Sequence, residues 1–300
     1  MDTFKLKTGA SAPYTIDKQT FEDLTFKRPP YYQKNSEGDI VQYAVCPQCD
    51  NPIQIIGLYK KSDNTDKPYG RHCPKSIQGL AVYNQQSYDY CIYANPNNKT
   101  DKSSRKSRTT NFEINIYNLM REQFDRIIYI LEKELDIKIS INLAKRMLKD
   151  YLDSEGWLYS WATINNLPWV LGYLSLAKSL YMQPVLKGSA LYNAILNNCP
   201  TAKFIPYEYN DKYVILTNKD RQFINIEFCI INHQKKLLDN KLTETMDLVV
   251  RDNTNEKDKR FFTKKIIINQ NYLLNLINYK SEKVYRNEKL LSIAKSLMTK

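Results

Sequence analysis

The middle of the chain carries apolar residues at the three- and four-residue spacing of amphipathic helices. Residues 112–135 predict a first helix, and Ser140 can cap a second one. Pro168 suits the first turn of a third helix that runs to about Met182; it is apolar on most sides, so we expect it to be buried. Residues 189–197 predict a short fourth helix. The apolar faces of the first two helices consist of Tyr117, Met120, Phe124, Ile127, Ile128, Leu131 and Leu135, and of Leu143, Met147, Leu148, Tyr151 and Leu152.

After residue 204 the pattern changes to short runs rich in β-branched and aromatic residues, which are typical of strands. These runs predict a small antiparallel sheet and cover residues 213–216, 223–231, 248–250 and 261–268. A charged turn is expected over 252–259. Residues 270–298 return to helical spacing and predict a terminal helix.

Residues 43–94 concentrate the residue types that bind soft metals. Four of the six cysteines and one of the two histidines fall in this stretch: Cys46, Cys49, His72, Cys73 and Cys91. The two-residue spacing of Cys46 and Cys49 is that of a zinc knuckle, a tight turn in which both thiolates point at one ion. Structural zinc takes four tetrahedral nitrogen or sulfur ligands, so two further ligands are needed.

The two further ligands come from His72, Cys73 and Cys91. Adjacent residues of an extended chain point to opposite faces, so His72 and Cys73 are not expected to bind one ion together. We expect a structural Zn²⁺ on Cys46, Cys49, His72 and Cys91, and the alternative set has Cys73 in place of His72. Free thiols or a disulfide are the competing interpretation. A catalytic zinc is not expected, because the sequence contains neither HExxH nor an H-x-E…PCxxC pattern.

The hydrophobic pattern around this cluster completes the expected fold. Ile53, Ile55 and Leu58 predict a strand that returns over residues 69–73 after a polar turn at 62–66. The fold class is α+β, with an N-terminal zinc-ribbon-like β module, a central helical region, and a C-terminal small antiparallel sheet with a terminal helix. The expected divisions are residues 1–96 for the module with the zinc-knuckle-like site, 97–110 for a basic polar linker, 111–200 for the helical region, and 201–300 for the antiparallel β part with its C-terminal helix.

The chain is basic, with a formal net charge of +12 and a pI near 9.2. Such a balance favours nucleic acid, an anionic surface or an acidic protein as the partner. The predicted linker lacks large apolar residues and carries five cations: Lys99, Lys102, Arg105, Lys106 and Arg108. We interpret this segment as a solvated spacer, and alternatively as a loop that contacts phosphates or an acidic partner.

Signatures of catalysis are absent from the sequence, which has no P-loop, no GxGxxG and no nucleophile in a known elbow. His233 ends a strand-like run, where a surface or turn role is expected. The sequence has neither an apolar secretory signal nor a run of about 18 apolar residues, so we expect a cytoplasmic protein without a membrane span. These features predict a binding protein and not an enzyme.

The stretch CPQCDNPIQIIGLYKK…YGRHC…GLAVYNQQSYDYCIYA resembles the N-terminal part of a family of phage-encoded anti-defence proteins, the inhibitors of the bacterial Gabija system. The abundance of Lys, Asn, Ile and Tyr, which points to an AT-rich genome such as many phages have, agrees with this resemblance. The resemblance implies a non-enzymatic protein that binds a nuclease–helicase defence complex in the host bacterium. It further implies a homo-oligomer that surrounds the complex and blocks its access to DNA. No contact residues carry over from the family.

Three functions compete at this point. The first is the inhibitory binding protein that the resemblance implies. The second is a basic nucleic-acid-binding protein with a structural zinc site, whose affinity would fall steeply with salt because neutralised phosphates release counterions. The third is a metal-dependent nuclease built from scattered carboxylates, which ranks last because no motif points to it.

Overall fold

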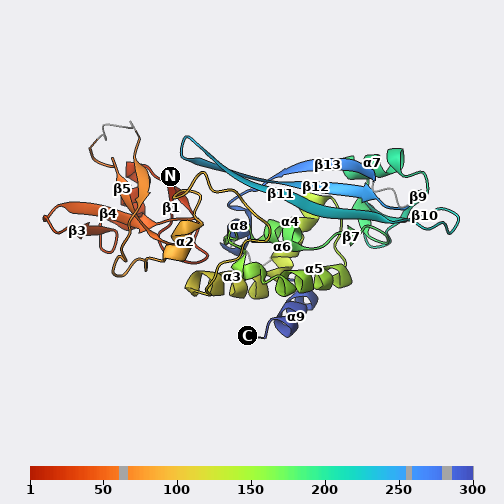
Figure 1. The fold of residues 1–300 in the computed structure, drawn as a ribbon, viewed down its shortest axis with the longest axis horizontal. Coiled ribbons are helices and arrows are strands. Elements are labelled where there is room, and N and C mark those ends of the chain that lie inside the picture. The colour runs from red at the N-terminus through yellow and green to blue at the C-terminus, as the bar shows by residue number, and fades with distance from the viewer. Residues whose placement is uncertain (61–66, 255–258, 279–285, 300) are drawn as a thin grey trace.

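The computed structural model of the protein describes residues 1–60, 67–254, 259–278 and 286–299. In this part of the chain, helices and several antiparallel sheets form an elongated molecule with the N-terminal residues at one end (Figure 1). The mixed helix-and-sheet class predicted from the sequence is confirmed.

The N-terminal module is built on an antiparallel sheet of β3 (Tyr32–Lys34), β4 (Ile40–Val45), β5 (Pro52–Ile56) and β6 (Tyr69–His72), in that spatial order. The ribbon of β1 (Thr3–Phe4) and β2 (Tyr14–Thr15), helix α1 (Lys18–Thr25) and short helix α2 (Gln85–Asp89) complete it. Phe4, Phe21 and Ile53 are buried there beside Cys46 and Cys91, in a hydrophobic cluster separate from that of the rest of the molecule. The predicted hairpin of β5 and β6 is confirmed, and its polar turn at 62–66 lies outside the described residues.

Helices α3 (Asn111–Glu122) and α4 (Phe124–Leu135) occupy the stretch for which a single helix was predicted. Gln123, with φ −122, interrupts the helical backbone between them. Its N–H still bonds the carbonyl of Leu119, and its carbonyl accepts from Ile127, so the apolar spacing continues through the break. Helix α5 (Ile141–Asp153) begins as predicted, because Oγ of Ser140 accepts a hydrogen bond from the backbone N–H of Leu143 at 3.3 Å.

Helix α6 (Leu167–Leu174) is buried along its whole length, as expected, but it ends at Leu174 and not near Met182. Ser175 stops it, because its backbone is extended and its hydroxyl donates to a carbonyl of the last turn at 2.8 Å. Asp150 then binds the ammonium of Lys178 at 2.5 Å, and residues 178–179 leave the helical layer to form a strand, β7 (Lys178–Ser179).

Two antiparallel sheets lie beyond the helices (Figure 1). One has the order β13 (Lys259–Ile267), β12 (Lys241–Asp252), β11 (Ile226–Leu238) and β7. The other has the order β8 (Pro184–Leu186), β10 (Tyr213–Asn218) and β9 (Ala202–Pro206), with helix α7 (Ala190–Asn198) between β8 and β9 in the chain. The predicted sheet and the short fourth helix are therefore present, but β7 and β8 fall within residues 111–200, which are not purely helical.

The hairpin of β11 and β12 is far longer than the predicted runs, because a β-bulge lets it continue through polar sequence. The pairing register shifts between Ile231 and Gln234, and Asn232 has a positive φ of 55. Before the bulge the even-numbered residues Phe228 and Ile230 are buried; after it the odd-numbered His233 and Lys235 are. The extra residue of the bulge thus turns the polar side chains of His233 and Lys235 toward the interior.

Helix α6 packs directly on β11 in the main hydrophobic core. A Cβ atom added at Gly172 would lie 2.6 Å from Cδ1 of Ile230, so a larger residue here would force the end of the Ile230 side chain to move. Trp161 and Trp169 are buried in the same core, and Trp157 is half-buried against it.

The C-terminal part has two helices, α8 (Tyr272–Asn278) and α9 (Glu288–Leu297), where one was expected over 270–298. Residues 279–285, which follow α8, and residues 255–258, half of the predicted charged turn, lie outside the described residues. Helix α9 packs against α3, α4 and α5, and Arg286 just before it pairs with Asp125 at 2.8 Å.

Candidate metal centre

Three separate segments of the N-terminal module carry the candidate ligands. Cys46 and Cys49 occupy the tight turn between β4 and β5, where the N–H of Cys46 bonds the carbonyl of Asn51 at 2.8 Å. The backbone at Asp50 takes a positive φ of 58, which closes this turn. His72 is the last residue of β6, and Cys91 follows α2.

The four ligand atoms form one compact group in which all separations are at most 4.8 Å. Sγ of Cys46 lies 3.8 Å from Sγ of Cys91, and Nε2 of His72 lies 3.3 Å from Sγ of Cys49 and 3.7 Å from Sγ of Cys91. A tetrahedral zinc with Zn–S bonds of about 2.3 Å separates its sulfur ligands by about 3.8 Å. The group therefore has the size that a four-coordinate ion of this type needs.

Cys73 does not join this group. It is buried next to His72 in sequence, but it packs in a different small cluster with Tyr43 and Ile77. The alternation of side chains along an extended strand places the two neighbours on opposite sides, as expected from the sequence. Of the two ligand sets considered, the structure brings together the one with His72.

The cysteines of the group are free thiols, since no sulfur pair approaches the bond length of about 2.05 Å that a disulfide requires. Burial and the adjoining sulfur atoms raise the pKa of the Cys49 and Cys91 thiols well above the usual value. The main physical cause is that burial removes the water that would stabilise a thiolate, and the adjoining sulfur atoms add to the effect. A divalent cation supplies a counter-charge and permits all three thiols to ionise.

Polar groups around the ligands hold them in place. Nδ2 of Asn51 donates to Sγ of Cys49 at 3.4 Å, and the same side chain bonds both the N–H of Asn84 at 2.6 Å and its carbonyl at 3.0 Å. Asn84 caps α2, so Asn51 ties the knuckle to the helix that precedes Cys91. The ring of Tyr88 packs edge-on against His72, with centroids 5.3 Å apart. Such outer contacts fix the orientation of metal ligands.

The arrangement has the features of a structural site. The three cysteines are buried and His72 is half-buried. The neighbouring carboxylate, Asp50, is bound by the ammonium of Lys5 and by the N–H of Gly9 at 2.8 Å, so it does not face a reacting position. Four soft ligands fill a tetrahedral shell and leave no open position for a substrate.

The knuckle is joined to the rest of the molecule through Gln48, one of the two residues between its cysteines. Nε2 of Gln48 donates to Oε1 of Gln270 at 3.0 Å, and its Oε1 accepts from Nζ of Lys235 at 3.3 Å. Lys235 lies 3.6 Å from Glu244, which pairs with it across β11 and β12. The metal-binding turn is thereby hydrogen bonded to a buried polar network of the body.

Glu244 is the centre of this network. Its carboxylate accepts from Asn166 at 2.7 Å and from Gln270 at 2.6 Å, and it lies 2.6 Å from Nε2 of His233. Burial acts to raise the pKa of Glu244, but the charge of Lys235 and these hydrogen bonds outweigh it and lower the pKa to about 2. The carboxylate is therefore ionised at neutral pH.

His233 has a different position from the one expected. The sequence predicted a surface or turn role, but the side chain is buried between Glu244 and Tyr159, whose hydroxyl lies 2.8 Å from Nδ1. Burial lowers the pKa of His233, with Glu244 opposing, so the ring is neutral at pH 7. The bulge at Asn232 is the cause, because it turns His233 inward.

The five cations of the predicted linker are not equivalent. Lys99, Lys102 and Arg108 are exposed, whereas Nε of Arg105 donates to the carbonyl of Ser154 at 2.7 Å. Lys106 is buried, so it is removed from the expected surface contacts. The segment is bonded along the body at these points, which differs from a solvated spacer.

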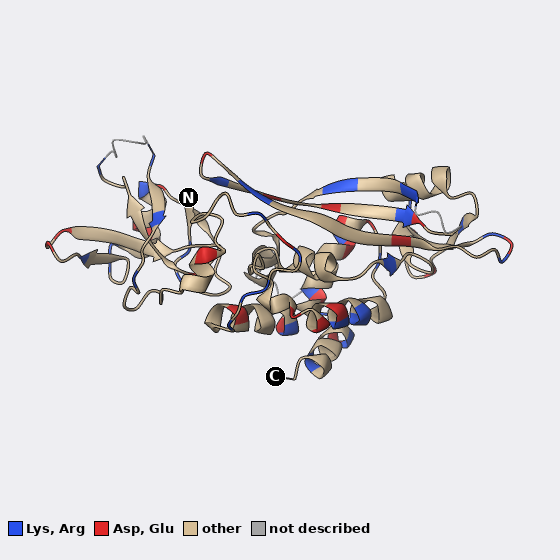
Figure 2. Cartoon of the chain, in the orientation of Figure 1, with Lys and Arg blue, Asp and Glu red and all other residues tan. Residues whose placement is uncertain are grey.

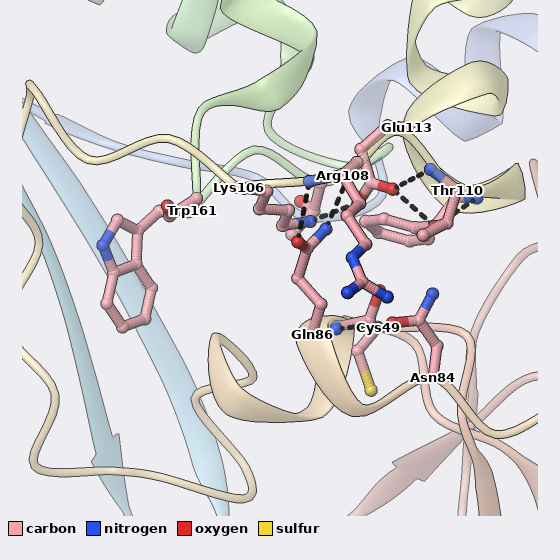
Figure 3. A network of polar contacts seen from close by, with 12 residues as sticks. Cys49, Asn84, Gln86, Lys106, Arg108, Thr110, Glu113 and Trp161 are labelled. Carbon is pink, nitrogen blue, oxygen red and sulfur yellow. Dashed lines mark hydrogen bonds and ion pairs between the residues drawn. The ribbon is translucent and has the colours of Figure 1, made fainter.

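Lys106 belongs to the junction between module and body. Its ammonium pairs with Glu113 at 2.8 Å, and Glu113 also accepts from the N–H of Thr110 at 2.8 Å to cap α3. Gln86 reaches from α2 to the same segment, with its Oε1 accepting from the N–H of Arg108 at 3.0 Å and its Nε2 donating to the carbonyl of that residue at 2.8 Å (Figure 3). The basic segment thus holds the metal module against α3.

Sequence reasoning missed Gln48, Lys235 and Glu244 as functional neighbours of the metal site. Gln48 carries no signal beyond its place inside the CxxC turn. Lys235 and Glu244 could have been found only by recognising that a bulge reverses the inward face of a polar strand.

Comparisons of the chain with protein-family models, curated proteins and solved structures found no match. Among the residues that the structure describes, none of the helices has the length and apolar character needed to cross a bilayer.

Proposed function

We propose that the protein is a non-enzymatic binding protein whose N-terminal module is a zinc-ribbon-like unit with a structural Zn²⁺ on Cys46, Cys49, His72 and Cys91. The set of four ligands supports this proposal most directly. Four protein ligands would crosslink the segments of a small module through one ion and would leave no coordination position for a substrate. Three thiolates and one imidazole in a tetrahedral group favour zinc among the common biological metals.

The partner that we propose is a bacterial anti-phage defence complex, as implied by the resemblance of residues 46–94 to Gabija inhibitors. In this proposal the protein forms a homo-oligomer in the host cytoplasm, binds the nuclease–helicase complex and blocks its access to DNA. The free thiols of Cys46, Cys49, Cys73, Cys91 and Cys199 are compatible with a reducing compartment.

One surface of the module supports protein binding. Tyr32, Ile40 and Tyr59 line an open hollow of about 580 Å³ on the β3–β4 side, and Ile40 and Tyr59 are 63% and 47% exposed. Lys27 and Lys34 lie at its edge. An apolar centre with a charged rim is the composition of protein–protein interfaces.

The proposal is tested by mixing the purified protein with a reconstituted Gabija nuclease–helicase complex. We expect co-elution in size-exclusion chromatography with light scattering, and loss of DNA cleavage at a molar excess of the protein. Ile40→Asp is expected to weaken both effects, and Ile267→Asp, at a residue with similar exposure of 68% on the edge strand β13, serves as the matched control. Unchanged cleavage with no co-elution would show that this complex is not the target.

A further inference from the structure

A second candidate site lies at the bulge of β11, apart from the metal centre. The bulge and residues 96–100 enclose an open pocket of about 580 Å³, with Tyr173 as its aromatic wall. Pockets of about 300–1,000 Å³ hold small ligands in proteins. The sheet segment and the loop come from distant parts of the sequence, so the pocket exists only in the folded chain.

Hydrogen bonds hold the walls of this pocket in place. The side chain of Asn232 donates to Asp247 at 2.8 Å, and the hydroxyl of Thr100 donates to the carbonyl of His233. The ring of His233 is held by Tyr159 and by the Glu244 network. A bulge anchored in this manner presents its outward side chains in one arrangement, which reduces the entropy cost of binding.

The pocket is positively charged. Lys99 and Lys236 line it and are exposed, and neither forms an ion pair with any residue that the structure describes. No carboxylate lines it. Of the carboxylates nearby, Asp247 accepts from Asn232, Asp101 accepts from the N–H and hydroxyl of Ser103, and Glu244 is buried in its own network. Figure 2 shows several Lys and Arg positions along the β11–β12 hairpin.

Neutral donors accompany the two cations. Asn97 and Gln234 also line the pocket and carry amide groups. A cluster of ammonium and amide donors matches the oxygen atoms of a phosphate group. The ring of Tyr173 is only 6% exposed, and the ammonium of Lys102 lies 5.1 Å from its centroid. This wall therefore brings a third cation close to the pocket.

We propose that this pocket binds the phosphate of a nucleotide, with Lys99 and Lys236 as its cationic contacts. The nucleotide is either free or part of a nucleic-acid strand. This site is independent of the inhibitory function proposed above, because it uses neither the metal ligands nor the apolar hollow of the module.

The test uses two probes, a fluorescently labelled single-stranded DNA oligonucleotide of 12 nucleotides in anisotropy titrations over a range of salt, and ATP in calorimetry. Each lysine that contacts a single strand contributes about 0.7 to the slope of log K against log salt. The double variant Lys99→Ala, Lys236→Ala is therefore expected to lower that slope by about 1.4 for the oligonucleotide.

The matched control is the double variant Lys203→Ala, Lys289→Ala, which removes the same charge from exposed lysines elsewhere. It is expected to bind both probes as the wild-type does. ATP binding that is lost only in the pocket variant identifies a free nucleotide, and oligonucleotide binding that ATP does not displace identifies a strand. The proposal is overturned if the wild-type binds neither probe, or if the pocket variant and the control bind alike.

Discussion

Gln48 and Lys235 lie 187 positions apart in the sequence, yet the side-chain oxygen of Gln48 accepts a hydrogen bond from the Lys235 ammonium at 3.3 Å. Through this contact the turn between two metal ligands meets a buried carboxylate, Glu244, of the central hairpin. A change at the candidate metal centre is therefore expected to alter the stability of the body, and a change in the body to alter the stability of the module.

Removal of a metal ligand is expected to unfold the N-terminal module. Cys46→Ser should abolish the binding of about one zinc per chain and lower the melting temperature, because the binding free energy of structural zinc, on the order of 10 kcal/mol, contributes to folding. Elemental analysis and thermal denaturation measure the two effects. Cys73→Ser is the control, since Cys73 lies outside the ligand group and its variant should keep the metal. Loss of zinc in both variants to the same degree would contradict the ligand set.

Replacement of Lys235 by methionine is expected to destabilise the protein by about 3 kcal/mol. The physical reason is that a buried carboxylate, Glu244, would lose the cation that compensates it. Lys236→Met, at the exposed neighbouring position, should change the free energy of unfolding by no more than about 0.5 kcal/mol. Chemical denaturation of both variants decides the matter, and equal effects would count against a compensating role for Lys235.

Acid is expected to destabilise the fold through Glu244. The folded-state pKa of about 2 lies below the ordinary value of 4.5, so the folded state binds fewer protons. The resulting stabilisation, about 3 kcal/mol, is complete above pH 4.5 and is lost as the pH falls toward 2. His233 also makes the fold less stable in acid. Because its pKa is lowered in the folded state, its contribution to the free energy of unfolding is present above pH 6.5 and is lost as the pH falls.

Denaturation at a series of pH values checks this prediction, with Glu244→Gln as the comparison. Acid release of the metal affects both proteins, so the difference between their curves isolates the carboxylate. The curve of the variant should be flatter below pH 4.5, and parallel curves would be inconsistent with an ionised Glu244.

Substitution of Gly172 by alanine is expected to cost about 1–3 kcal/mol, because the new methyl group would lie 2.6 Å from Cδ1 of Ile230. The double variant Gly172→Ala, Ile230→Val removes that carbon atom and should recover part of the loss. Thermal denaturation of the single and double variants measures this coupling; strict additivity would argue against the α6–β11 contact.

Local sequence patterns were sufficient to predict a helix cap, the buried helix faces and the candidate ligand set. Ser140 caps its helix as predicted, the apolar faces of α3 to α5 are buried, and the cluster of Cys46, Cys49, His72 and Cys91 is assembled from its spacing and strand alternation. The cap and the helix faces depend on residues that are near one another in sequence, whereas the ligand cluster joins segments up to 45 residues apart whose residue types alone mark them.

The remaining features depend on contacts that no local pattern contains. The end of α6 is set by Ser175 and by Asp150. Asp150 lies on a different helix, α5, and forms an ion pair with Lys178 of β7. The hairpin extends through polar residues because a bulge reverses its inward face. The sequence predicts Lys106 to be solvated, because nothing in it indicates that Glu113, in the first turn of α3, is the partner of Lys106.

The separation of the two hydrophobic clusters also bears on the order in which the protein assembles during synthesis. All four candidate ligands lie within the first 91 residues, so the module can complete its core while the rest of the chain is still on the ribosome. Gln48 must then keep a hydrated amide until Lys235 and Gln270 have been translated. Joining of the module to the hairpin is therefore a late step, and a chain interrupted before β11 would display an unpaired docking face.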